Sequence, residues 1–206
     1  MPLPNGVSPL GQLSATCPSA AWMGNRGVLH DDAGHLVRET QRKAWLTCAL
    51  HYKERNRKPL MQPHRYTELF FLDEATALAA GHRPCAECRN RSYKAFKRHW
   101  LTANGHAGNM SAAQIDACLH AERSDRRADG DWLQRVSGLP AGVIVFRNDA
   151  LHLWTGAALR PWMSTGYGPA AVADDIAGNV RLCTPPSIVR AIADGYAVQM
   201  HSSAIP

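Results

Sequence analysis

The feature that most constrains this chain is a pair of cysteines separated by two residues, in the segment Gly81-His82-Arg83-Pro84-Cys85-Ala86-Glu87-Cys88-Arg89. Two thiolates at this spacing can bind one tetrahedral metal ion from a tight turn. The backbone N–H groups of such a turn can donate to the sulfurs, and a helix that begins after the turn further favours the thiolate form. The motif therefore predicts a metal centre built on Cys85 and Cys88, with zinc as the expected ion.

The same spacing also occurs in thiol–disulfide redox sites, which are expected in a thioredoxin-like βαβ context. Here a basic loop and a short predicted helix precede the pair, and this favours a metal site over a redox site.

Residues 1–6 lack the charged region and apolar stretch of a secretory signal, and no apolar run is long enough to span a membrane. We therefore expect a cytoplasmic protein without a membrane partner, in which thiols stay reduced.

A complete zinc site needs ligands beyond the CxxC pair. Cys48 is the expected third ligand, and the segment Cys48-Ala49-Leu50-His51 makes His51 the first candidate for the fourth. His30, His64 and His120 are the alternatives for that position. Four protein ligands would indicate a structural ion, whereas three ligands plus water would indicate a catalytic one.

The residues before the CxxC pair carry a resemblance to a known family. The aromatic pair and a leucine, Phe70-Phe71-Leu72, an alanine-rich segment from Asp73 to Ala80, and Gly81-His82-Arg83-Pro84-Cys85 follow one another without a gap. This run of about twenty residues, 70–89, resembles the second half of the Ada-type zinc-binding domain. In that family this half supplies two zinc thiolates. The first half supplies two more from a C-x3-C pair, and one of those accepts a methyl group from DNA phosphotriesters. The resemblance implies zinc binding and an association with DNA or DNA repair.

The chain departs from the family pattern in the first half of the domain. Cys48 falls roughly where the first family cysteine would lie, but no second cysteine follows it within four residues. The family's four-thiolate site is therefore not intact, and Cys48 is the only position to which the methyl acceptor could correspond. Residues 22–30 and the C-terminal half resemble those of uncharacterised bacterial proteins with an Ada-like knuckle, which implies a bacterial family.

Positive charge is concentrated on both sides of the CxxC pair. The formal net charge is +6, which is compatible with a polyanionic partner. We expect nucleic acid, DNA more than RNA, to be contacted by a set of basic residues in loop 52–64 and helix 89–103. These residues are Arg55, Arg57, Lys58, Arg91, Lys94 and Arg98. The alternative is a basic surface that only promotes solubility.

The pattern of apolar and turn residues predicts an α+β fold. We expect a small zinc-knuckle region, followed by helices and a short-stranded, mostly antiparallel sheet. Residues 1–21 are predicted to form an extended or flexible arm and residues 22–138 an Ada-like zinc-binding region with helices. Residues 139–206 are predicted to form a β-rich region. This region is either a separate domain, with a boundary near Gly138, or part of one domain with the preceding residues.

Individual elements follow from periodicity and capping residues. Strands are predicted at 44–50, 66–72, 143–146, 151–155, 159–163, 179–183 and 197–201. Helices are predicted over 74–80 (capped by Asp73), over 89–103, from the Ser111/Gln114 capping box to about 127, and after Thr184. Asn148-Asp149 is a predicted hairpin turn.

The sequence is also compatible with two other classes of function. The first is a zinc-dependent hydrolase or nuclease with an open metal site, for which His30, His120 and Glu122 are the catalytic candidates. The second is a structural zinc in a protein that binds a small molecule. The number of protein ligands on the metal distinguishes the catalytic ion from the structural one.

Overall fold

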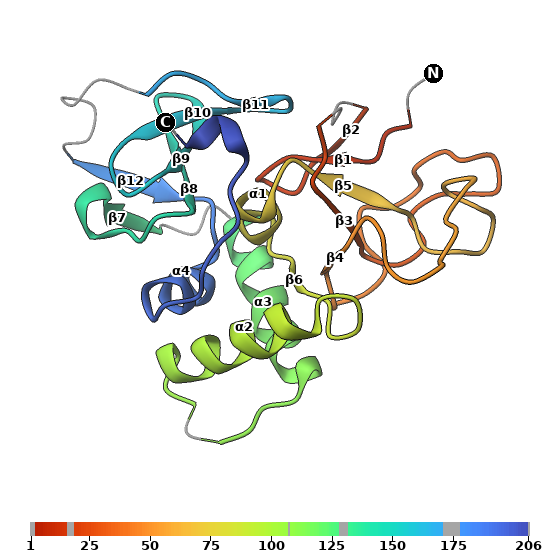
Figure 1. Ribbon diagram of the computed structural model, residues 1–206, viewed down its shortest axis with the longest axis horizontal. Coiled ribbons are helices and arrows are strands. Elements are labelled where there is room, and N and C mark those ends of the chain that lie inside the picture. Colours follow the sequence, from red (N-terminus) through yellow and green to blue (C-terminus); the bar gives the residue numbers. More distant parts are fainter. Residues whose placement is uncertain (1–2, 16–18, 107, 128–131, 171–177, 206) are drawn as a thin grey trace.

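The computed structural model describes residues 3–15, 19–106, 108–127, 132–170 and 178–205. This part of the chain forms two six-stranded sheets and four α-helices, so the predicted α+β class is confirmed. Helix α1 (Glu74–Ala79) lies between the two sheets, and the remaining helices lie together below them (Figure 1). Within the described ranges, no helix has the length and apolar character needed to cross a membrane.

The first sheet has the strand order β2-β1-β5-β3-β4-β6. Its strands are β1 (Gly6–Val7), β2 (Leu13–Ser14), β3 (Trp22–Asn25), β4 (Leu46–Cys48), β5 (Leu69–Phe71) and β6 (Arg83–Pro84). The strands predicted at 44–50 and 66–72 are present as β4 and β5. Residues 6–7 and 13–14 belong to the predicted arm, yet they are strands, because Gly6 pairs in parallel with Phe70 and buries Val7 in the core.

The second sheet has the order β11-β10-β9-β8-β12-β7, and all its strand pairs are antiparallel. Its strands are β7 (Leu133–Arg135), β8 (Val143–Arg147), β9 (Ala150–Trp154), β10 (Leu159–Met163), β11 (Gly166–Tyr167) and β12 (Asn179–Leu182). The four strands predicted between residues 143 and 183 are confirmed. Asn148 and Asp149 both have positive φ, 48° and 57°, as the predicted two-residue hairpin turn requires.

The predicted helices are present as α1, α2 (Asn90–Ala103), α3 (Ala112–Arg127) and α4 (Pro186–Ala193). Helix α3 begins with the predicted capping box. Ser111 Oγ accepts the N–H of Gln114, and Gln114 Oε1 accepts the N–H of Ser111.

The start of α4 differs from the prediction by one residue. Pro185 is the N-cap, whereas Thr184 was predicted to cap the helix. The Thr184 hydroxyl instead accepts the N–H of Ile144 in the second sheet. Glu122, which is distant in sequence, takes over the capping role predicted for Thr184. Its carboxylate accepts the backbone N–H of Ser187 at 2.8 Å and the Ser187 hydroxyl at 2.6 Å.

The strand predicted at 197–201 is not formed. The N–H of Gln199 donates to Glu74 Oε2 at 3.1 Å, and the N–H of His201 donates to Asp73 Oδ2 at 2.9 Å. Buried carboxylates therefore take the donors that a strand would give to a neighbouring strand. These bonds attach the C-terminal segment to the start of α1.

Helix α1 is buried along its whole length, which explains its small side chains. Ala75 and Ala79 pack with Ile144 and other residues of the second sheet, whereas Ala77 packs with Phe71 and other residues of the first. Alanine side chains let both sheets approach the helix backbone closely. Asp73 caps the helix as predicted, since its Oδ1 accepts the N–H of Thr76.

The largest apolar cluster extends below α1. It contains Phe96 and Trp100 from α2, and also Val143 and Ile188 from beyond the boundary predicted near Gly138. The helix-rich middle of the chain and its β-rich end therefore share apolar contacts.

Four buried polar contacts hold the segment 81–89 against the rest of the fold. Arg83 donates from Nε and Nη2 to the two oxygens of Asp116 on α3, at 2.7 and 2.8 Å. Arg89 donates to Glu74 at 2.6 Å, Arg26 donates to His82 at 3.2 Å, and Arg123 donates to the carbonyl of Gly81 at 2.8 Å. These contacts fix the backbone from which both cysteines of the CxxC pair project.

We expect Asp116→Ala to destabilise the fold by about 3–5 kcal/mol, because it leaves the Arg83 guanidinium buried without its partner. The side chains of this pair are only 5% and 7% exposed. Urea unfolding followed by circular dichroism measures the change. The matched control is Glu87→Ala, which removes the exposed ion pair of Glu87 with Arg55 and should cost less than about 1 kcal/mol. Equal losses in the two variants would contradict the structural role of the Arg83–Asp116 pair.

Candidate metal centre

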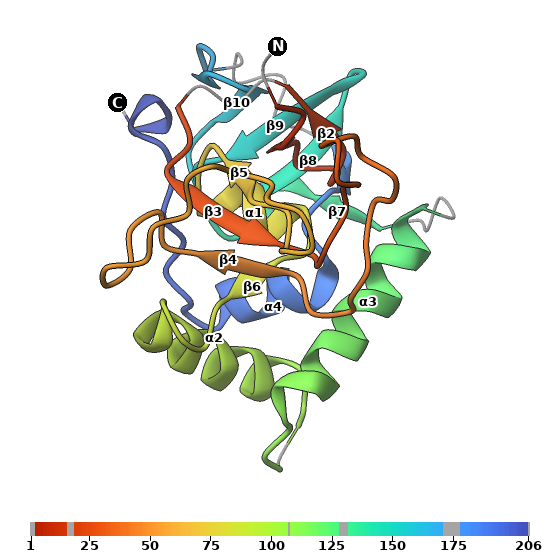
Figure 2. The same ribbon diagram turned by 90° about the vertical axis from the view of Figure 1, so that its right-hand side faces the viewer.

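Strand pairing brings Cys48 and Cys85 together. Strands β4 and β6 are parallel neighbours, with Leu46 opposite Arg83 and Thr47 opposite Pro84. The residue that follows each of the second pair is a cysteine, Cys48 at the end of β4 and Cys85 directly after β6, and the N–H of Cys85 donates to the carbonyl of Thr47 at 2.9 Å. Figure 2 shows β3, β4 and β6 side by side above α2. Two cysteines that are far apart in sequence therefore emerge at one point of the sheet edge.

The turn after β6 adds the third sulfur. The chain reverses between Cys85 and Arg89, whose N–H donates to the Cys85 carbonyl at 3.1 Å, and α2 begins at the following residue. The Sγ atoms of Cys48, Cys85 and Cys88 all lie within 4.8 Å of one another. Among the described residues, no other group of three histidine, cysteine or acidic side chains meets this condition.

Hydrogen bonds at this site favour the thiolate form of Cys85, whereas the pKa values of Cys48 and Cys88 are raised. The pKa of Cys85 is lowered, because the thiols of Cys48 and Cys88 donate to it and the backbone N–H groups of Cys88 and Glu87 add to the effect. The N–H of Ala49 donates to Cys88 Sγ at 3.4 Å, from the other side of the site. The pKa of Cys48 is raised, since its thiol donates to Cys85 and Cys88 and is buried. A divalent ion would take the place of these shared protons and could be held by all three sulfurs.

The walls of the site are apolar. Met23 packs beside Cys48 and Cys85, and partly buried residues such as Leu50, Tyr66 and Phe70 complete the cluster. Cys48 and Cys85 are 6% and 9% exposed, whereas Cys88 is only half-buried. Such a dry shell strengthens the attraction between a cation and the thiolates.

The histidines predicted as fourth ligands have different surroundings. His51 follows Cys48 by three residues and is exposed, and its ring is not part of the group of three sulfurs. His30 is buried and hydrogen-bonded to Thr67 Oγ1 at 2.7 Å and to the carbonyl of Gln62 at 3.2 Å. His64 is exposed, and its ring lies 3.9 Å from Asp32, while His120 is half-buried on α3. The identity of the fourth ligand stays a prediction.

The other catalytic candidate, Glu122, holds the N-terminus of α4 through Ser187. Burial raises the pKa of its carboxyl group, and the hydrogen bonds from Ser187 oppose this rise. Among the described residues, neither Glu122 nor His30 nor His120 joins a group of potential metal ligands. A catalytic role for these three side chains stays a prediction.

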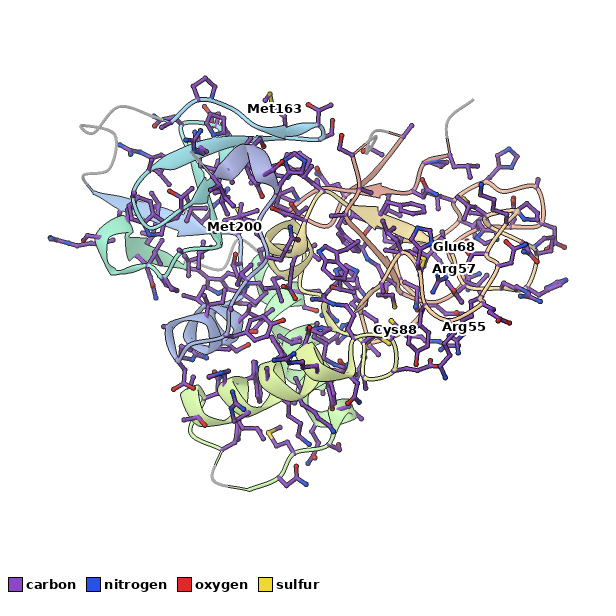
Figure 3. The ribbon with its side chains drawn as sticks, viewed as in Figure 1. Arg55, Arg57, Glu68, Cys88, Met163 and Met200 are labelled. Atoms are coloured by element: carbon purple, nitrogen blue, oxygen red, sulfur yellow. The ribbon has the colours of Figure 1, made fainter. Side chains whose placement is uncertain are left out.

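The proposed phosphate-binding residues lie on both sides of the sulfur group. Arg91, Lys94 and Arg98 are exposed on α2, opposite the buried Phe96 and Trp100, as the predicted amphipathic pattern requires. Arg55 and Lys58 are exposed in the loop between β4 and β5. Figure 3 shows Arg55 and Arg57 at the end of the molecule that carries Cys88, away from Met163 and Met200.

Two of these arginines also have partners inside the protein, which the sequence did not reveal. Arg55 forms an ion pair with Glu87, which lies between the two cysteines of the turn. Arg57 Nη1 donates to the carbonyl of Leu50 at 2.7 Å. The basic loop is therefore attached to the surroundings of the three sulfurs at two points.

Sequence reasoning also missed the charged residues that position the turn. Arg83, Arg89 and their partners Asp116 and Glu74 are buried, although charged residues are mostly found at surfaces. One signal was present, because Arg83 and Arg89 flank the CxxC pair within the segment that carries the Ada resemblance. Nothing local identified Asp116, which lies on a different helix.

Comparison of the chain with protein-family models, with curated proteins and with solved structures gives no match. The geometry of the three-cysteine site is therefore the basis for inferring a function.

We predict about one zinc ion per chain, held by the three sulfurs. Elemental analysis of purified protein should find this stoichiometry in the wild type and almost none in the Cys85→Ser, Cys88→Ser double variant. Cys118→Ser is the matched control, since Cys118 lies on α3 outside the sulfur group, and it should keep its zinc. A metal-free wild type, or equal zinc in all three proteins, would rule out this centre.

A second prediction concerns the fourth ligand. If His51 moves onto the ion, His51→Ala should weaken zinc binding, measured by competition with a coloured chelator. His35→Ala replaces another exposed histidine, one that is not a candidate ligand, and should leave the affinity unchanged. Equal zinc affinity in His51→Ala and wild type would assign the fourth position to water or to another group.

Proposed function

We propose that this protein binds zinc through Cys48, Cys85 and Cys88 and uses the metal centre to organise a surface that binds nucleic acid. The single observation that carries the proposal is the convergence of three sulfurs within 4.8 Å. Soft thiolate ligands in this arrangement suit zinc better than calcium or magnesium, which prefer oxygen.

Support for a nucleic-acid partner comes from the position of the basic residues. The loop that carries Arg55 and Arg57 is attached to the sulfur site through Glu87 and Leu50. On the other side, α2 begins directly after the CxxC turn and exposes Arg91, Lys94 and Arg98. A metal ion at the turn would hold both basic segments in one orientation. The resemblance to the Ada-type domain favours DNA over RNA.

A second candidate is a zinc-dependent hydrolase, and the number of protein ligands favours it. Only three sulfurs come together in the described part of the chain, and three protein ligands plus water is the usual pattern of a catalytic zinc. Hydrolysis of a phosphodiester by the zinc-loaded wild type, lost in the Cys85→Ser, Cys88→Ser variant, would support this alternative.

Salt dependence tests the nucleic-acid proposal. Binding to duplex DNA should weaken with salt, with a log–log slope of roughly −5 if six phosphates are contacted. Changing Arg55, Arg57 and Lys58 to Ala should reduce the affinity and bring the slope to roughly −3. Fluorescence anisotropy at several salt concentrations measures both quantities.

The matched control changes three other exposed basic residues, Arg38, Arg42 and Lys43, to Ala. It removes the same charge but no residue of the proposed surface. Its slope should stay close to that of the wild type. No binding at low salt, or the same change of slope in both triple variants, would contradict the proposed nucleic-acid surface.

A further inference from the structure

A small recess lies beside the metal centre, within the loop between β4 and β5. Its volume is about 310 Å³, at the lower end of the range for ligand sites. Seven residues line it: Arg55, Asn56, Arg57, Gln62, Arg65, Tyr66 and Glu68. Three arginines and one glutamate are among these residues, so the lining carries an excess of positive charge.

Two of the three guanidinium groups are not neutralised. Arg55 is paired with Glu87, but within the described ranges neither Arg57 nor Arg65 has a carboxylate at ion-pair distance. Glu68 is buried, and its Oε2 accepts the N–H of Met61 at 2.8 Å without an ion pair to the neighbouring arginines. The Glu68 carboxylate and the arginines therefore line the same recess without forming an ion pair across it.

Arg57 provides the most specific observation. Its Nη1 is bonded to the Leu50 carbonyl, yet its Nε is buried and has no acceptor among the described residues. Buried polar groups usually have a hydrogen-bond partner, either a protein group or ordered water, and the described residues supply none for this donor. The planar fork of an arginine matches two oxygens of a phosphate.

The backbone around the recess is also strained. Lys53, Met61 and His64 have positive φ values of 51°, 54° and 62°. Non-glycine residues in this region are uncommon, and they cluster at ligand-binding sites. Long loops without secondary structure are likewise often functional.

We propose that this recess binds a phosphate group, held by the guanidinium groups of Arg57 and Arg65. In nucleic acid the group would be a phosphate of the backbone or of a 5′ end, and otherwise it would be a free phosphate. Only the first source rests on the proposed function. Figure 3 shows Arg57 and Glu68 close to Cys88 in the view, and Tyr66 belongs both to the recess and to the apolar wall of the sulfur site. The bound phosphate therefore lies beside the metal centre.

Calorimetric titration of the zinc-loaded full chain with inorganic phosphate at low salt tests the proposal. We expect saturable binding that weakens about tenfold or more in Arg65→Ala, through loss of a charge-assisted contact. Arg57→Lys keeps the charge but loses the fork, and it should also weaken binding. Glu68→Gln removes a like charge and should strengthen binding. Arg38→Ala, which lies outside both the recess and the proposed nucleic-acid surface, should leave it unchanged.

A competition experiment separates the two sources of phosphate. Oligonucleotides with and without a 5′-phosphate are titrated in the presence and absence of inorganic phosphate. Competition supports the proposal and places nucleic acid in the recess. Phosphate binding without competition supports the proposal with a small phosphorylated ligand, even if the nucleic-acid function fails. Absence of phosphate binding, or equal affinities in the wild type and the Arg65→Ala, Arg57→Lys and Glu68→Gln variants, would overturn the proposal whatever the oligonucleotides do.

Discussion

The buried ion pair between Arg83 and Asp116 is the interaction on which the geometry of the three-cysteine site depends. It attaches β6 to α3 through two hydrogen bonds of 2.7 and 2.8 Å. Strand β6 has only two residues, too few to hold its own register against β4 by backbone bonds alone. With Arg83 fixed opposite Leu46, Cys85 must emerge beside Cys48. The convergence of the sulfurs is therefore a consequence of an interaction outside the site.

Neighbouring contacts extend this control to the rest of the CxxC turn. Arg89 at the N-cap of α2 pairs with Glu74, which also accepts the hydroxyl of Tyr196 and the N–H of Gln199. Gly81 has a φ of +84°, and a Cβ there would lie 2.7 Å from the Arg123 side chain, so glycine is required for this close approach. Both ends of the turn are thus held in place before a metal ion binds, which reduces the conformational entropy that binding must remove.

Local sequence signals predicted much of the fold. The capping residues Asp73 and Ser111, the turn at Asn148-Asp149 and the apolar stripe of α2 were sufficient to place their elements, because each depends on residues only a few positions apart. Cys48, Cys85 and Cys88 were identified as one group from spacing and family resemblance. The predicted strand at 197–201 was wrong, since the partners of its N–H groups are carboxylates more than a hundred positions earlier. Contacts of this range depend on the tertiary fold, and a single sequence does not encode them as a pattern.

X-ray absorption at the zinc edge of the metal-loaded protein tests the central claim most directly, because it counts the atoms bound to the ion. The account predicts three sulfurs at about 2.3 Å and one nitrogen or oxygen at about 2.0–2.1 Å. A first shell with fewer than three sulfurs would contradict a metal centre built on Cys48, Cys85 and Cys88.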